Sequence, residues 1–233
     1  VNGSPITGWQ AIGGYWYYFD PAQNGAAAMG IYEVGVKLYS FDSEGHRSWG
    51  GGWQILNGKT CYVDSDGCVL TGWQAIGGYW YYFNPTTGAI TTNVAVIGGT
   101  AYLFDSQGHR VWQGWNTING RKYYADINGS PVLGWQAIGG YWYYFDPAQN
   151  GAAIVNGVQR IDGMDYLFAP SGYRYFAGVY ELNGRVYLVD ANGAVVNSSS
   201  SKLTVTMNGQ VVTGTSVEIL ARIVAGEVGG LVN

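Results

Sequence analysis

Residues 8–19 read GWQAIGGYWYYF, and the same twelve residues return unchanged at 72–83 and at 134–145. An exact internal repeat indicates the architecture of a chain, because each copy must fold in the same way against its neighbours. Cutting the chain at its glycine–aromatic boundaries gives nine units of about 20 residues between residues 8 and 197. They belong to three types, A, B and C, which follow one another in that order three times.

The three unit types differ in pattern. A units contain the repeated stretch, B units carry Tyr-x-Phe-Asp-Ser-x-Gly-His-Arg in their first two copies, and C units carry Asn-Gly before a strand. B units cover residues 30–51, 93–113 and 156–177, and C units cover 52–71, 114–133 and 178–197. Residues 1–7 match the end of an earlier C unit, so we expect an upstream part of the protein to be missing here.

Each unit is predicted to form a β-hairpin. The strand residues are aromatic or β-branched, which suits a pleated and half-buried surface. The turns are Asn-Gly pairs or Asp-x-x-Gly clusters such as residues 64–67 and 190–193, in which glycine accepts a positive φ. A single hairpin is marginally stable in water, but stacked hairpins bury a continuous core, as in a solenoid.

Alternation along a strand separates two faces in the repeated stretch. Tyr17 and Phe19 share one face, and their positions stay aromatic or aliphatic in nearly all units, so we predict that this face is core. Trp16 and Tyr18 share the other face. The Trp16 position becomes Leu, Thr, Ala, Lys, Asp or Val in B and C units, which indicates that the tryptophan is retained for a purpose other than folding.

Composition excludes several classes of protein. Only 11% of the 233 residues are charged and 16% are aromatic, which does not suit a disordered chain. Eleven Lys and Arg with a net charge of -4 cannot form the basic surface of a nucleic-acid-binding protein. No apolar run approaches the roughly 18 residues of a membrane span.

The cysteines and histidines do not form a metal-site pattern. Cys61 and Cys68 flank one turn, so they form either a local disulfide or two small apolar positions, and their spacing is not that of a zinc site. His46 and His109 stand at turn exits one full repeat apart, which is typical of surface turn residues. We expect no metal and no cofactor.

The chain changes character after residue 197. Residues 198–202 are predicted to be a serine-rich linker, and residues 203–233 begin with an alternating strand and an Asn-Gly turn at 208–209. From Val217 the apolar spacing predicts a helix. This segment is too short to form an enzyme core by itself.

The units of residues 1–197 resemble the cell-wall-binding repeats of Gram-positive bacteria, also called choline-binding repeats. The resemblance rests on Gly-Trp, then a Trp-Tyr-Tyr-Phe strand, then an Asp-x-x-x-Gly turn, recurring through the chain. Related repeats occur in streptococcal glucosyltransferases and in clostridial toxins. The family implies an all-β solenoid of stacked β-hairpins, a left-handed superhelix with about three hairpins per turn, so that one A-B-C period makes one turn.

The resemblance also implies a ligand site between successive hairpins, where two tryptophans and a tyrosine enclose the quaternary ammonium of choline. B units lack both tryptophans and C units lack the second, so complete cages are expected only at A units. Aromatic rings that merely pack hairpin against hairpin, or that stack on a wall glycan, are the alternatives. The candidate ligand-binding residues are Trp9, Trp16, Tyr18, Trp73, Trp80, Tyr82, Trp135, Trp142 and Tyr144, with aromatic residues of the next unit as further candidates for the third wall.

Residues 203–233 resemble the start of a SpoIID-type domain, the peptidoglycan lytic transglycosylase family. The match rests on Leu203 to Gly209 and Val217 to Val228. The resemblance implies that Glu227 is a general acid, but only in a complete domain. In this chain an ordinary helix-terminal glutamate is the alternative that we favour, because the rest of the pocket is missing.

The sequence therefore predicts noncatalytic attachment to the bacterial cell wall, through choline, teichoic acid or glycan, that targets a downstream peptidoglycan-cleaving domain. A peptidoglycan hydrolase in the full-length protein, and a glycan-binding adhesin or structural stalk, are the other hypotheses. The expected location is extracellular and cell wall-associated, with no nucleic-acid partner.

Overall fold

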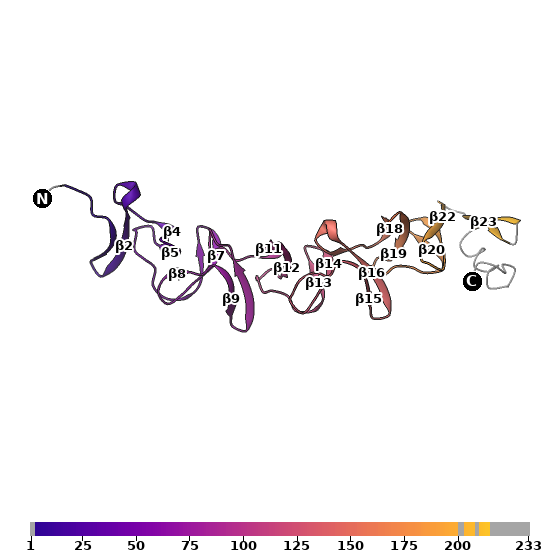
Figure 1. The fold of residues 1–233 in the computed structure, drawn as a ribbon, viewed down its shortest axis with the longest axis horizontal. Coiled ribbons are helices and arrows are strands. Elements are labelled where there is room, and N and C mark those ends of the chain that lie inside the picture. The colour runs from indigo at the N-terminus through magenta and orange to yellow at the C-terminus, as the bar shows by residue number, and fades with distance from the viewer. Residues whose placement is uncertain (1–2, 200–202, 208–209, 215–233) are drawn as a thin grey trace. The chain divides into compact units, whose positions relative to one another are not determined.

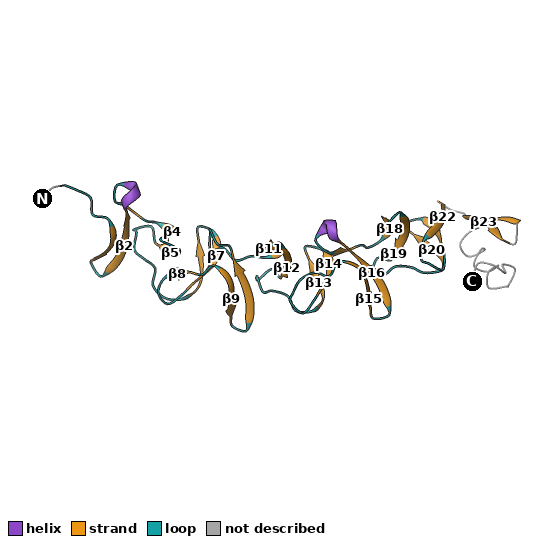
Figure 2. Cartoon of the chain, viewed as in Figure 1, coloured by secondary structure: helices purple, strands orange, loops and turns teal. Residues whose placement is uncertain are grey.

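The computed structural model describes residues 3–199, 203–207 and 210–214. The regular secondary structure of the described residues is almost entirely β-strand, and hairpin follows hairpin along the sequence (Figure 1). Among these residues the helical turns are two short 3₁₀ segments, η1 (Pro21–Gln23) and η2 (Pro147–Gln149), drawn purple in Figure 2. The described residues divide into two compact parts, residues 3–112 with 127–130, and residues 113–126 with 131 onward.

Nine antiparallel hairpins of the described chain lie within the nine predicted units, one in each. The A hairpins are β1–β2 (Gly8–Ile12, Tyr15–Asp20), β9–β10 (Gly72–Ile76, Tyr79–Phe83) and β15–β16 (Gly134–Ile138, Tyr141–Asp146). The B hairpins are β4–β5 (Gly30–Val34, Lys37–Phe41), β11–β12 (Asn93–Ile97, Thr100–Phe104) and β18–β19 (Gly157–Ile161, Met164–Phe168). The C hairpins are β6–β7 (Gly52–Leu56, Lys59–Val63), β13–β14 (Gly114–Ile118, Arg121–Ala125) and β20–β21 (Gly178–Leu182, Arg185–Val189).

Two-residue turns close these hairpins in a common way. Leu56 pairs with Lys59, which leaves only Asn57 and Gly58 in the turn, and both have positive φ, 51° and 72°. That backbone suits the right-handed twist of paired strands, and Asn-Gly adopts it at low cost. The turn residues therefore fix the register of the strands, and the register fixes which side chains share a face.

Some units have a short third strand, which follows the turn after the second strand of the hairpin, and these third strands were not predicted. They are β3 (Ala26–Ala27), β8 (Cys68–Val69), β17 (Ala152–Ala153) and the longer β22 (Val195–Ser199). β8 pairs with β7 of its own unit and also with β5 of the preceding unit. A B unit and a C unit are thereby joined in one five-stranded sheet, in the order β4-β5-β8-β7-β6.

The Phe19 position forms the core, as predicted. Phe83, Phe104, Phe145 and Phe168 have no exposed surface, whereas Phe19 itself is half-buried. Full burial of such a ring contributes roughly 1.5–3 kcal/mol relative to an exposed one, so these four rings are a main source of hairpin stacking energy.

The junction between the first B unit and the first C unit is aliphatic instead of aromatic. Its buried residues are Leu38, Cys61, Val63 and Val69, with Ile31 packed against them. Cys61 and Cys68 are both buried as free thiols, so the structure shows two small apolar positions and no disulfide.

The predicted C-terminal hairpin is present, with β23 (Leu203–Met207) paired to β24 (Gln210–Gly214). The predicted linker is wrong at its start, because Ser198 and Ser199 continue β22 and pair with Tyr187 and Val186 of β21. The free edge of β21 accepts these residues despite their composition. The predicted helix from Val217, with Glu227, lies outside the described residues.

Candidate ligand-binding junctions

Five tryptophans occupy the same place in their hairpins, the second residue of the first strand. In each, the register pairs the tryptophan with a tyrosine on the second strand, as Trp9 pairs with Tyr18 and Trp115 with Tyr124. The indole meets that tyrosine edge to face, with ring centroids 5.1–5.4 Å apart. The five are Trp9, Trp73 and Trp135 of the A units and Trp53 and Trp115 of the first two C units.

Each of these indoles also contacts two rings of the next hairpin. One is a tyrosine whose centroid lies 4.8–4.9 Å away in an edge-to-face arrangement. The other is a phenylalanine at 5.7–5.9 Å. Aromatic pairs at such distances add about 0.5–1.5 kcal/mol beyond their buried area, so the clusters also stabilise stacking. The tyrosines are Tyr39, Tyr81, Tyr102, Tyr143 and Tyr166.

The candidate residues of the A units lie on one face of their hairpins, as their spacing predicts. Trp9 lies 6.5 Å from Trp16, and the register places Trp73 and Trp80 diagonally on the same face. Tyr18, Tyr82 and Tyr144 lie against Trp9, Trp73 and Trp135. The second tryptophans remain partly open to solvent, 38% for Trp16, 43% for Trp80 and 41% for Trp142.

Sequence reasoning assigned the Tyr17 position to the core alone, and this was incomplete. Tyr81 and Tyr166 are buried, but Tyr39, Tyr102 and Tyr143 are half-buried, and all five face the tryptophan of the preceding hairpin. The clusters therefore form between hairpins, at A–B junctions and at C–A junctions. The recurrence of tyrosine at the Tyr17 position of B and A units is the sequence pattern from which these clusters could have been predicted.

A cavity of about 310 Å³ opens at the second C–A junction. Trp115 and Tyr143 supply its aromatic walls, and Asn116, Thr117 and Lys122 supply polar groups. The Lys122 ammonium donates a hydrogen bond to the backbone oxygen of Ser171 at 3.1 Å. The ring faces can hold a quaternary ammonium or stack on a sugar, and the hydrogen-bonding side chains suit a sugar.

The A–B junctions contain an arginine that sequence reasoning overlooked. The guanidinium carbon of Arg47 lies 5.4 Å from the Trp9 ring and 5.1 Å from the Tyr39 ring. Arg174 lies 5.1 Å from Trp135 and 5.4 Å from Tyr166. Burial lowers the pKa of Arg174, although the nearby Tyr166 and Asp190 oppose this.

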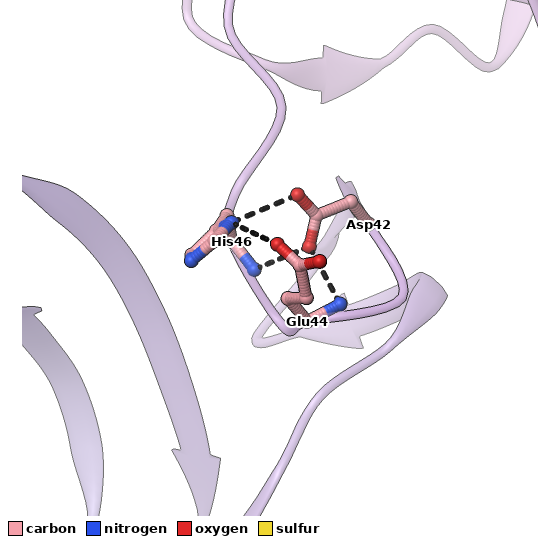
Figure 3. Close-up of side chains that lie close together, drawn as sticks. All are labelled: Asp42, Glu44 and His46. Atoms are coloured by element: carbon pink, nitrogen blue, oxygen red, sulfur yellow. Dashed lines mark hydrogen bonds and ion pairs between the residues drawn. The ribbon is translucent and has the colours of Figure 1, made fainter.

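Asp42, Glu44 and His46 bring three potential metal-ligand atoms within 4.8 Å of one another (Figure 3). His46 Nδ1 lies 2.9 Å from Asp42 Oδ2 and 3.5 Å from Glu44 Oε2. Burial opposes ionisation of Asp42, but backbone N–H groups of His46 and Glu44 bond its carboxylate and lower its pKa.

The turn containing His109 is built in the same way, with Nδ1 2.7 Å from Asp105 Oδ2, although Gln107 replaces the glutamate. Each imidazole also stacks on a tyrosine of the preceding A unit, with His46 4.0 Å from Tyr15 and His109 4.0 Å from Tyr79. The shared pattern indicates a turn-to-hairpin packing role, consistent with turn residues.

No described helix is long and apolar enough to cross a membrane. Residues 51–94 and 112–157 match the choline-binding repeat family, and residues 7–22 match a family of cell wall binding repeats. These segments of the chain are cell-wall-binding repeats. The sequence-based resemblance is confirmed over these segments, and such repeats imply association with the Gram-positive cell wall.

Two relatives of similar sequence are much longer proteins than this chain. Glucosyltransferase-S of Streptococcus mutans is 31% identical over 206 residues, which covers 84% of this chain and 13% of that protein. Toxin A of Clostridium novyi is 34% identical over 118 residues, 47% of this chain and 5% of the toxin. The chain thus spans a small fraction of their length.

A solved structure of similar fold is choline binding protein F from Streptococcus pneumoniae, determined in the presence of a peptidoglycan analogue. It shares 23% identity, with a TM-score of 0.54, over 88% of this chain and 86% of that one. The likeness establishes the fold, and it confirms the predicted all-β solenoid of stacked hairpins.

Proposed function

We propose that this chain attaches noncatalytically to the bacterial cell wall, outside the cell, through the aromatic junctions between its hairpins. The observation that carries the proposal is the fivefold recurrence of one arrangement, in which a Gly-Trp indole meets a tyrosine of the next hairpin at 4.8–4.9 Å. A purely structural stalk would need stacking energy but not partly exposed indoles, such as Trp53 at 44% and Trp115 at 43%.

The ligand that fits these rings is choline carried on teichoic acid, with a wall glycan as the competing ligand. A quaternary ammonium over an indole face gains roughly 0.5–2 kcal/mol per contact. Several such sites on one chain that bind one wall polymer raise the overall affinity well above that of one site. The candidate tryptophans and tyrosines of the A units, including Trp16, Trp80 and Trp142, remain part of this proposal as exposed stacking surface.

Sedimentation with purified Gram-positive walls tests the proposal. We expect the chain to sediment with choline-containing walls and to be released by free choline. Release by soluble wall glycan and not by choline would assign the site to sugar, and binding to host glycans alone would favour an adhesin. The double variant Trp53→Ala/Trp115→Ala should lose most binding, whereas Val36→Ala, at a 97% exposed position outside the junctions, should not. Unchanged binding by the double variant contradicts the proposal.

We also propose that residues 203–233 begin a SpoIID-like catalytic domain that this repeat region targets to peptidoglycan. The described part of that segment is the β23–β24 hairpin, which supports the predicted strand pattern. A longer version of the chain should release anhydromuropeptides, and its Glu227→Gln form should not. An active Glu227→Gln form would contradict the role of Glu227 as general acid, and cleavage by residues 1–233 alone would contradict the noncatalytic role of this region.

A further inference from the structure

One position separates the B units from every other unit. Each hairpin is followed by a second turn, which comes after its second strand and ends in a glycine. The position lies two residues after that glycine, and in the B units it is Arg47, Arg110 and Arg174. A and C units carry an uncharged residue there: Ala27, Val69, Ile90, Pro131, Ala153 and Val195. A cation therefore recurs once per repeat period, always at the hairpin that follows an A unit.

The arginine lies among three aromatic rings in the first and third A–B junctions. Besides the Trp9 and Tyr39 rings, Arg47 lies 4.7 Å from the ring of Trp49. Arg174 lies 4.4 Å from the ring of Phe176, in addition to those of Trp135 and Tyr166. All these distances are within the roughly 6 Å at which a cation is attracted by a ring face. The third ring comes from the residue two positions after each arginine, which is aromatic in all three B units, with Trp112 in the second.

The side chains of Arg47 and Arg174 are enclosed by the residues of the junction. Nε of Arg47 and of Arg174 is buried and has no hydrogen-bond partner among the described residues, so ring faces are its surroundings. Each side chain runs over the turn glycine of the following C unit. A Cβ on Gly67 would lie 3.1 Å from Arg47 Nε, and a Cβ on Gly193 would lie 2.9 Å from Arg174 Nε.

The second B unit follows the same plan. A Cβ on Gly129 would lie 2.7 Å from Arg110 Cγ, so the stem of Arg110 occupies the equivalent place over the equivalent glycine. The placement of the arginine stem over the turn glycine therefore recurs in all three B units, and the ring contacts of the guanidinium are those of Arg47 and Arg174.

We propose that Arg47 and Arg174 are resident ligands, which fill the aromatic cages of the first and third A–B junctions and leave the C–A junctions to take external quaternary ammonium groups. The inference rests on the proposed function, and it differs from the expectation that complete choline cages lie at A units. A guanidinium tethered in the cage has no translational entropy left to lose, so it outcompetes a soluble cation of equal intrinsic affinity.

The C–A junctions have the same indole–tyrosine geometry without a charged residue at the critical position. Trp53 and Tyr81 lie 4.9 Å apart, Trp115 and Tyr143 lie 4.8 Å apart, and the corresponding positions are Ile90 and Ala153. The cavity of about 310 Å³ beside Trp115 is the space that this arrangement leaves.

Calorimetric titration with choline chloride tests the inference on the whole chain. Wild type should bind choline at the C–A junctions and not at the first and third A–B junctions, so Trp53→Ala/Trp115→Ala should reduce the heat signal and Trp9→Ala/Trp135→Ala should leave it unchanged. Arg47→Ala and Arg174→Ala should each add one choline site, because each opens a cage. The matched control is Arg160→Ala, since Arg160 lies in a B unit but is largely exposed and pairs with Asp165.

An independent measurement covers variants that fail to fold. In the ¹H–¹⁵N spectrum of wild type, the side-chain Nε–H protons of Arg47 and Arg174 should be shifted upfield by ring currents relative to that of Arg160. Normal shifts for both arginines would overturn the inference, and so would choline binding that is lost in Trp9→Ala/Trp135→Ala. Arginine variants that gain no choline site would also overturn it. Failure of wild type to bind walls would refute the proposed function alone, since a choline site gained on removing Arg47 would still support the resident arginine.

Discussion

Adding one methyl group at Gly67 should destabilise the stacking of the first C unit on the first B unit. Gly67 closes the Asp64–Gly67 turn with φ of 73° and hydrogen-bonds Asp64 through its N–H. A Cβ at this position would lie 2.2 Å from the backbone oxygen of Ser48. That oxygen belongs to the main chain, so it cannot move aside as a flexible side chain could.

The magnitude follows from comparison with Gly35. Gly35 has φ of 68°, close to that of Gly67, but a Cβ there meets nothing within 4 Å. An alanine costs roughly 1–2 kcal/mol in this backbone conformation at either position. Overlap with packed atoms adds typically 1–3 kcal/mol, and only Gly67→Ala incurs it. We therefore expect Gly67→Ala to lose about 2 kcal/mol more than Gly35→Ala.

Native-state hydrogen exchange is the suitable assay, because stacked repeats open locally and one global unfolding energy would hide the effect. The reporter is the Leu70 amide, which donates to the Tyr62 backbone oxygen at 2.8 Å. Its free energy of opening should fall in Gly67→Ala and stay near the wild-type value in Gly35→Ala. Equal losses in the two variants would show that the turn does not pack against Ser48, and would refute the reasoning.

The remaining predictions concern binding, pH dependence and thiol reactivity. Trp80→Ala should weaken sedimentation with walls while leaving the thermal midpoint nearly unchanged, because its ring is 43% exposed; an equal loss of both would show that Trp80 is core. The Tyr32 hydroxyl donates to Asp20 and lowers its pKa, so the stabilisation it provides is present above the unfolded pKa and is lost as pH falls through the lower folded value. Tyr32→Phe should raise the pKa of Asp20 in a carboxyl ¹³C titration, and an unchanged value would contradict this. Cys61 and Cys68 are both buried, and burial raises the pKa of Cys61, so we expect both thiols to react with a thiol reagent only after unfolding because the reagent cannot reach them in the native chain. Rapid reaction of the native chain, or the absence of thiols after unfolding, would contradict the structure.

The repeat predicted the hairpins, the two faces of each strand and the buried phenylalanines, because these depend on short-range pattern. Turn residues such as Asn57-Gly58 set the register locally, and alternation then assigns each side chain to a face. Phe104 and Phe145 could therefore be placed in the core without any knowledge of the neighbouring hairpin.

The composition of the aromatic clusters could not be predicted in the same way. Alternation says that Tyr39 and Phe41 share a face, but it does not say which residues of the preceding hairpin that face meets. The offset between stacked hairpins depends on tertiary packing, which brings Tyr39 to Trp9 and places Arg47 beside both rings. Ser198 and Ser199 show the same limit, since their composition indicates a linker while the open edge of β21 makes them a strand.

The equivalence of Tyr81 and Tyr143 bears on how the repeat region can change in length over generations. Trp53 contacts Tyr81 at 4.9 Å and Trp115 contacts Tyr143 at 4.8 Å. A recombination event that removes residues 72–133 joins the first C unit directly to the third A unit, and Trp53 then meets Tyr143 in the place of Tyr81. The deletion creates no new kind of junction, so repeat number can rise or fall in whole periods without a compensating mutation.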